Sequence, residues 1–137
     1  MAYYPKRCAQ QLWKEKPNLE NVKSIIWGKK HESVAREEYE KLHNCHVKEV
    51  GIFLSKIQPL IGASPDGMID NGRGLLEIKC PYSLRTNNLK EDLEEVPKNS
   101  FFTLVNGKLC LKKEHPYHYQ VQTQMFCTNA RYTDFFI

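Results

Sequence analysis

An Asn-Gly pair at positions 71 and 72 constrains the fold of this chain more than any other feature of the sequence. Two runs rich in apolar residues flank the pair, Leu60 to Ile69 and Gly74 to Cys80. Asn-Gly in that setting is the strongest short-range signal for an antiparallel β-hairpin. A two-residue turn fixes every pair along the hairpin, and the register then sets Asp66 opposite Glu77. A bulge at Gly74 would instead shift the pairing by one residue.

Two carboxylates side by side on one face of a sheet repel each other unless a cation lies between them. Directly opposed residues have Cβ atoms about 4.5–5.5 Å apart, and Mg²⁺ takes carboxylate oxygens while keeping waters that can meet substrate phosphates. Strand alternation directs Glu77 and Lys79 to one face and their apolar neighbours to the other. An ammonium there can help to activate a water and offset charge on phosphorus. Asp66, Glu77 and Lys79 therefore predict a magnesium-dependent phosphodiester-cleaving centre. The alternative is a solvent-exposed hairpin with ordinary surface charges.

Upstream of the hairpin, residues 21–43 are predicted to form a helix with a carboxylate on its inner face. The helical spacing is carried by Gly28, Glu32, Ala35, Tyr39 and Leu42, a stripe that is expected to face the core. A carboxylate within such a small or apolar stripe needs a partner. For Glu32 that partner is either a metal with its water shell or a neighbouring lysine in a salt bridge.

A second helix is predicted from His118 to about Thr128, because Pro116 can start it and fits the first helical turn. Gln120 and Gln124 are four residues apart and share one face of this helix. Their amide groups can bind phosphate oxygens or a metal-bound water without adding charge. The alternative is a pair of polar residues on an exposed helix face.

The rest of the chain shows turn and strand signals without a linker or a repeat. Strands are predicted at Val47 to Leu54 and Tyr132 to Ile137, a short acidic helix at Asn88 to Val96, and a second hairpin at Phe101 to Leu111 around another Asn-Gly. Together with a length of 137 residues, this predicts one domain over 1–137, of which 1–20 is the least patterned part.

Composition excludes several other classes of protein. Apolar residues make up 41% and charged residues 26% of the chain, which argues against disorder and against a fibrous repeat. No apolar run approaches the roughly 20 residues that span a bilayer, and the first residues do not form a signal peptide. The chain has five cysteines, an odd number without tight spacing. This pattern favours reduced thiols in an intracellular compartment, the cytoplasm or nucleus, over secretion.

The net charge of +4 is only mildly basic. Lys29 and Lys30 belong to a cluster that can contact phosphates, and the alternative is a solvated face. A zinc-stabilised interaction domain is a further alternative, with either of two ligand sets: Cys110, His115 and His118, or His43, Cys45 and His46. Neither set has the paired C-x₂-C spacing that is typical of zinc sites.

Four segments together resemble a known family. They are Trp27-Gly28-Lys29-Lys30-His31-Glu32, Gly62-Ala63-Ser64-Pro65-Asp66-Gly67, Leu76-Glu77-Ile78-Lys79-Cys80-Pro81 and Tyr119-Gln120-Val121-Gln122. In this order they resemble the YqaJ-like viral recombinase family, which includes the lambda exonuclease, within the PD-(D/E)xK nuclease superfamily. The resemblance covers roughly Ser24 to Ile137. It implies an α/β (α+β) restriction-endonuclease-like core in which helices flank a central mixed β-sheet.

The resemblance also implies roles for individual residues. Asp66 and Glu77 would bind Mg²⁺, which Mn²⁺ can replace, together with the carbonyl of Ile78, and Lys79 would activate the attacking water. Glu32 matches a helix glutamate that positions metal or water, and Gln120 matches the glutamine of the late helix. Arg85 matches a basic residue that can meet the DNA terminus, and Ser64 lies in the aspartate motif; both are expected to contact DNA.

The function implied is a 5′-to-3′ exonuclease on double-stranded DNA in recombination or DNA processing. A homo-oligomer and a single-strand annealing protein are the expected partners, and no membrane is expected. An endonuclease or nickase on the same core is one alternative. A DNA-binding module without turnover is another, although such modules usually lose the Asp, Glu or Lys that this chain retains.

Overall fold

The chain builds its central sheet from strands that are far apart in the sequence. The computed structural model describes residues 21–85, 100–106 and 108–137. Strand β4 (Gly74–Ile78) lies in the middle of a three-stranded sheet, antiparallel to β3 (Gly67–Ile69) and parallel to β7 (Tyr132–Phe136). The sheet is therefore mixed, as predicted. The weakly patterned segment 1–20 and the helix expected at Asn88 to Val96 lie outside the described residues.

The hairpin between β3 and β4 has the register that its Asn-Gly turn predicts. Gly67 pairs with Leu76, Met68 with Leu75, and Ile69 with Gly74, so no bulge shifts the pairing. Asn71 has φ 54° and ψ 35° and Gly72 has φ 87°. These are the left-handed conformations that a two-residue turn of type I′ requires. The short 3₁₀ turn η1 (Asp70–Gly72) carries this reversal.

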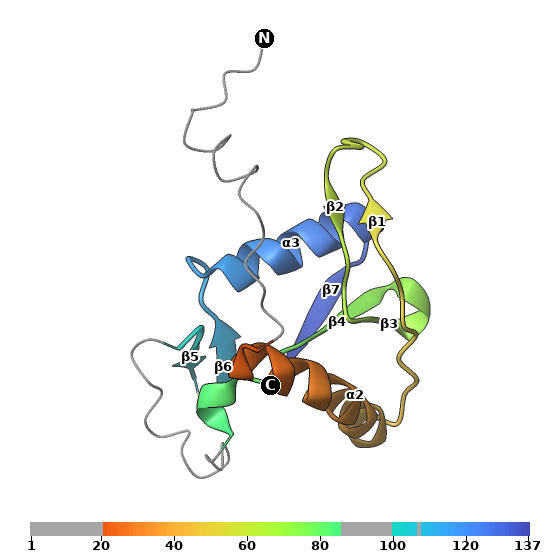
Figure 1. The fold of residues 1–137 in the computed structure, drawn as a ribbon. Coiled ribbons are helices and arrows are strands. Elements are labelled where there is room, and N and C mark those ends of the chain that lie inside the picture. Colours follow the sequence, from red (N-terminus) through yellow and green to blue (C-terminus); the bar gives the residue numbers. More distant parts are fainter. Residues whose placement is uncertain (1–20, 86–99, 107) are drawn as a thin grey trace.

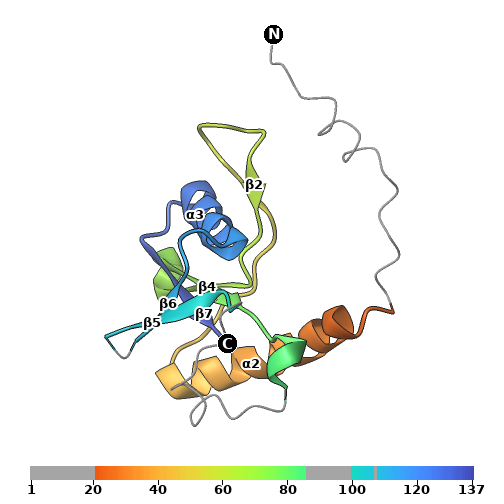
Figure 2. The same ribbon diagram turned by 90° about the vertical axis from the view of Figure 1, so that its left-hand side faces the viewer.

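Two helices cover opposite faces of the sheet (Figures 1 and 2). Helix α2 (Lys23–His43) packs Tyr39 against Leu76 and Ile78 of β4 in the buried core. Helix α3 (Pro116–Thr128) lies on the other face and reaches Glu77 with two side chains. All five residues of β4 are buried, because each face of this strand has a helix against it. The flanking helices of the sequence prediction are thus confirmed.

The predicted inner stripe of α2 is correct in its middle and wrong at its end. Tyr39 is 3% exposed and Ala35 packs against the core, but Leu42 is 71% exposed. Three residues advance an α-helix by 300°, so Leu42 lies about 60° around the helix from Tyr39, in the last turn. The helix ends at Asn44, which adopts φ 47° and donates its backbone N–H to the carbonyl of Glu40.

Two of the predicted strands are shorter than expected and form a separate small sheet. In place of Val47 to Leu54 the structure has β1 (Phe53–Leu54) and a single bridge between Lys48 and Met68. In place of Leu60 to Ile69 it has β2 (Gly62–Ala63) and β3, and β2 pairs with β1 rather than with β4. The break falls at Pro65, which has no N–H to donate to a ladder.

The second hairpin and the start of the late helix agree with the sequence. Strands β5 (Phe102–Val105) and β6 (Lys108–Leu111) form the hairpin, and Pro116 begins α3. The short 3₁₀ turn η2 (Tyr82–Leu84), which follows β4 after Pro81, was not predicted. Neither helix of the described residues is long and apolar enough to cross a bilayer.

Candidate active site

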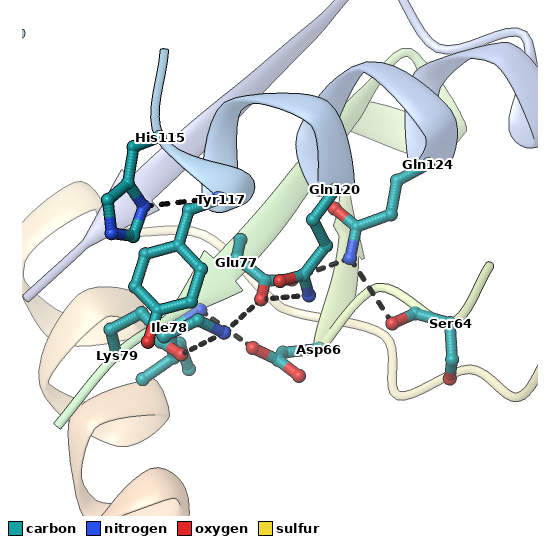
Figure 3. Close-up of polar contacts among 9 residues, drawn as sticks. All are labelled: Ser64, Asp66, Glu77, Ile78, Lys79, His115, Tyr117, Gln120 and Gln124. Carbon is teal, nitrogen blue, oxygen red and sulfur yellow. Dashed lines mark hydrogen bonds and ion pairs between the residues drawn. The ribbon is translucent and has the colours of Figure 1, made fainter. Parts of the chain in front are cut away.

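Glu77 is a fully buried carboxylate held by donors from two elements. Its exposed fraction is 0%. Oε1 accepts hydrogen bonds from Gln120 Nε2 at 2.6 Å and from the Lys79 ammonium, and Oε2 accepts one from Gln124 Nε2 at 2.6 Å. Figure 3 shows these contacts converging beneath α3. A buried charge is tolerated only where such partners compensate its lost hydration.

The Asp66 carboxylate bonds the main chain between Glu77 and Lys79, and the Ile78 carbonyl oxygen contacts Lys79. The Asp66 carboxylate lies one residue beyond the β3–β4 ladder, and its Oδ2 accepts the backbone N–H of Ile78 at 2.7 Å. Lys79 Nζ lies 3.3 Å from the Ile78 carbonyl oxygen while it also contacts Glu77 Oε1. The structure therefore brings Asp66, Glu77 and Lys79 together, as the register of the hairpin predicts.

The arrangement fits a hard divalent cation. Lys79 presents a positive charge to two oxygens at once, one from Glu77 and one from the main chain of Ile78. Those oxygens therefore already converge on a cationic group. With the Asp66 carboxylate nearby, the donor set consists of oxygens alone, which is the chemistry that Mg²⁺ prefers.

Glu32, on α2, lines a cavity that Ile78 and Lys79 also line. This cavity of about 470 Å³ is lined by Gly28, Glu32, Lys79 and Tyr117 among others. The nearest cationic partner of Glu32 is Arg36 Nη2 at 3.2 Å, an arginine one turn later rather than the lysine that the sequence suggested. Its expected role in metal or water positioning stays a prediction.

The thiol of Cys80 borders this group of charges. Burial raises its pKa, the Glu32 and Asp66 carboxylates raise it further, and the ammonium of Lys79 opposes them. The protonated thiol is thereby favoured, and a protonated thiol is a poor nucleophile.

Gln120 and Gln124 turn their shared face toward β4. Gln124 is 1% exposed and bonds both Glu77 and the carbonyl of Ser64, at 3.2 Å. The alternative of an exposed polar pair is therefore wrong for Gln124, whereas Gln120 is exposed and still bonds Glu77. Sequence reasoning paired Gln124 with Gln120 but left it out of the site. It missed Tyr117, although Tyr117 precedes Gln120 by three residues and shares its helical face.

The four residues expected to contact DNA are all at the surface. Lys29 and Lys30 are exposed on α2, Ser64 is exposed after β2, and Arg85 is exposed at the end of η2. The Arg85 guanidinium lies 4.0 Å from the centre of the Tyr82 ring and donates to the Tyr82 carbonyl at 2.8 Å. Their contacts with DNA stay predictions.

The two zinc sets do not assemble. Within 21–85, 100–106 and 108–137, no three His, Cys, Asp or Glu side chains gather closely enough to hold a metal by themselves. Cys110 is exposed on β6 and Cys45 packs beside the core. A metal at the site would accordingly need the main-chain oxygen of Ile78 as well as the two carboxylates.

Solved structures of an alkaline exonuclease share this fold. The chain matches the alkaline exonuclease LHK-Exo of Laribacter hongkongensis at 30% identity with a TM-score of 0.62, over 93% of this chain and 54% of that one. It matches the same protein in complex with dAMP at 28% identity with a TM-score of 0.63. The fold and the convergent Asp66, Glu77 and Lys79 thus define a PD-(D/E)xK core.

The model of the YqaJ-like viral recombinase domain matches residues 2–131, and the chain belongs to that family. An uncharacterized protein of Acanthamoeba polyphaga mimivirus is 32% identical, over 87% of this chain and 20% of the viral protein. The chain thus spans about a fifth of that relative and about half of LHK-Exo.

Proposed function

We propose that this chain is a divalent-metal-dependent deoxyribonuclease whose reaction takes place at Glu77, Asp66 and Lys79. The observation that carries the proposal is the double contact of Lys79 Nζ with the Glu77 carboxylate and the Ile78 carbonyl. It puts a cationic group between oxygens that the YqaJ-like family, by resemblance, uses for metal. The likeness to an alkaline exonuclease supports the same chemistry.

Asp66, Glu77 and the Ile78 carbonyl would hold the metal ion. A bound Mg²⁺ would polarise the scissile phosphate and lower the pKa of a bound water. Lys79 would then hold a proton or offset charge at the phosphate, while Gln120 and Gln124 keep the Glu77 carboxylate in one orientation. Fixed donors of this kind need no reorganisation during the reaction.

The finer assignment is a 5′-to-3′ exonuclease on double-stranded DNA that uses Mg²⁺, with Mn²⁺ as a substitute. The family resemblance supports the direction and the substrate. The solved relative in complex with dAMP supports the release of mononucleotides, since dAMP is the kind of product that exonucleolytic cleavage gives. A homo-oligomer and a single-strand annealing partner belong to the same proposal.

The test uses linear 5′-phosphorylated duplex DNA and nicked or closed circles, each with and without Mg²⁺. We expect wild-type protein to degrade linear DNA, chelation to stop it, and Mg²⁺ or Mn²⁺ to restore it. Lys79→Ala and Asp66→Asn should each lose about 10²–10⁴-fold in kcat. Lys56→Ala, in the loop between β1 and β2, is the matched control for loss of one lysine.

The outcomes separate the alternatives. Linear DNA lost while circles are spared supports the exonuclease, and nicking of closed circles supports an endonuclease. Equal activity in wild type, Lys79→Ala and Asp66→Asn would remove the assignment. Binding of DNA without any turnover in the presence of Mg²⁺ or Mn²⁺ would leave a DNA-binding module.

A further inference from the structure

The Lys79 ammonium has an aromatic neighbour as well as its oxygen partners. Nζ lies 5.1 Å from the centre of the Tyr117 ring, within the range of about 6 Å over which a cation is attracted to a ring face. Tyr117 occupies the first turn of α3, on the cavity wall that it shares with Lys79. Figure 3 shows its ring beside the lysine, separate from the glutamines that bond Glu77.

The ring of Tyr117 is held from several sides. Its centre lies 5.3 Å from that of Phe101, 5.9 Å from that of Phe135 on β7, and 4.6 Å from that of His115. The backbone N–H of Tyr117 donates to His115 Nδ1 at 3.2 Å. Aromatic pairs at these separations are attractive. Contacts with Phe101, with Phe135 on β7 and with His115 at the N-cap of α3 therefore fix the ring position, so it does not depend on Lys79 alone.

The two oxygens that hold the ammonium are the same oxygens that suit a divalent cation. Like charges repel strongly at contact distance in a partly buried site, so an ammonium and Mg²⁺ compete for Glu77 Oε1 and the Ile78 carbonyl. The face of the Tyr117 ring attracts an ammonium but presents only carbon atoms to a hard metal. It is therefore a partner that Lys79 can keep when a metal takes the oxygens.

We propose that Tyr117 is a positioning residue that retains Lys79 beside the reaction centre through its ring face. The catalytic role of Tyr117 rests on the proposed function, whereas the competition between the ammonium and the metal does not. Once the ammonium leaves the oxygens it can approach the ring face more closely than 5.1 Å, so the ring contact is stronger in the metal-bound state and favours metal binding. It also limits the positions that the lysine can then occupy.

The first test measures Mn²⁺ affinity by electron paramagnetic resonance, without DNA, in a double-mutant cycle. Tyr117→Leu should weaken Mn²⁺ binding about tenfold, because the ammonium loses its alternative partner. In a Lys79→Met background, which removes the competing ammonium, Tyr117→Leu should change the affinity less than about twofold. Tyr117→Phe retains the ring and should match wild type.

Two outcomes of the cycle would overturn the proposal. Equal weakening with and without Lys79 would make Tyr117 a merely structural residue, and no weakening in either background would remove its role. Wild-type protein that binds Mn²⁺ in this pattern but leaves DNA intact would sink the proposed function alone. Absence of Mn²⁺ binding by wild type would overturn both.

The second test separates the ring face from the ring volume. Phenylalanines with one, two or three ring fluorines at position 117 keep the shape of the ring but weaken the negative charge of its face. The kcat on linear duplex DNA should therefore fall with each fluorine, by about tenfold overall, while KM stays within about twofold of wild type. Phe126→Leu, which removes an exposed aromatic from the same helix, should have wild-type kinetics. A flat fluorine series, or Tyr117→Phe as impaired as Tyr117→Leu, would contradict the proposal.

Discussion

At the scale of single residues, a buried hydrogen bond ties α2 to the last strand. The Tyr39 hydroxyl donates to Asp134 Oδ2 at 2.5 Å, and the tyrosine is 3% exposed. Burial raises the pKa of Tyr39 above its ordinary 10.0, and the bond to Asp134 raises it further. The folded protein therefore holds this tyrosine in its neutral form at pH values where an unfolded chain would ionise it.

This bond predicts both a loss of stability and a change in alkaline behaviour. Because the folded pKa is raised, the stabilisation is complete below pH 10 and is lost as the pH rises from there toward the folded pKa. Tyr39→Phe should lower the free energy of unfolding at pH 7 by about 1.5–3 kcal/mol, the range for a bond to a charged group. The substitution should also make the free energy of unfolding decrease less steeply above pH 10. Urea unfolding followed by circular dichroism between pH 7 and pH 11 measures both effects.

Tyr119→Phe is the control, since Tyr119 is 63% exposed on α3. It should unfold like wild type at every pH. A Tyr39→Phe protein that declines above pH 10 as steeply as wild type would show that Tyr39 is not the group responsible.

The arrangement of the proposed catalytic residues was predictable because these residues lie close together in the sequence. One Asn-Gly turn fixes the positions of Asp66, Glu77 and Lys79 relative to each other, and the observed pairs have that register. Gln124 bonds a residue 47 positions away and Tyr39 one 95 positions away. A pattern within one helix shows which residues share a face but not which residues that face contacts. Only the structure therefore reveals these hydrogen-bond partners.

At the scale of elements, the segment between α2 and β1 comes unusually close to Gly67 in β3. A Cβ at this position would lie 2.2 Å from Val47 Cγ1, and Val47 is 3% exposed. The two backbones are joined by reciprocal 2.9 Å hydrogen bonds between Lys48 and Met68. The glycine that follows Asp66 in the sequence is therefore explained by packing, which only the position of Val47 reveals.

We predict that Gly67→Ala lowers the free energy of unfolding by about 1–3 kcal/mol, the usual cost of overpacking a core. Activity should fall as well, because the adjacent Asp66 moves with the strand. Denaturant unfolding gives the first quantity and the linear-DNA assay the second. In a Val47→Ala background the cost should shrink, since the clashing methyl group is gone.

Gly51→Ala serves as the matched control, because a Cβ there would meet nothing within 4 Å. It should change stability by less than about 0.5 kcal/mol. An equal cost for Gly67→Ala with valine or alanine at position 47 would show that the clash is not the cause.

The strand breaks show where local patterns stop being informative. A run rich in apolar residues predicted one strand from Leu60 to Ile69, yet β2 and β3 belong to different sheets. Pro65 marks the break, but the sequence does not say that β2 turns away to pair with β1 beside α3. That choice depends on contacts between elements, as does the parallel pairing of β4 with β7.

At the scale of the whole molecule, the charge distribution predicts how DNA binding depends on salt. The net charge is +4, and Lys29 and Lys30 are exposed next to Gly28, which lines the cavity of the site. If both lysines contact phosphates, the double substitution Lys29→Ala with Lys30→Ala should reduce the slope of log affinity against log salt by about 2, since each contact contributes about 0.9. Fluorescence anisotropy with a labelled duplex, without divalent metal so that no DNA is cleaved, gives this slope.

The same substitutions should weaken all duplex sequences about equally, because phosphate contacts carry no base information. Lys41→Ala is the control on the same helix, where the lysine lies in the last turn and pairs with Glu38 at 3.0 Å. It should keep the wild-type slope, because its charge is at the far end of α2 from the cavity. If Lys41→Ala lowers the slope as much as a single substitution at Lys29, the attraction comes from the overall charge of the molecule and not from a local phosphate contact. Attraction by the overall charge favours no one face of the molecule, whereas a local contact at Lys29 and Lys30 brings DNA to the face with the cavity that Gly28 and Lys79 line.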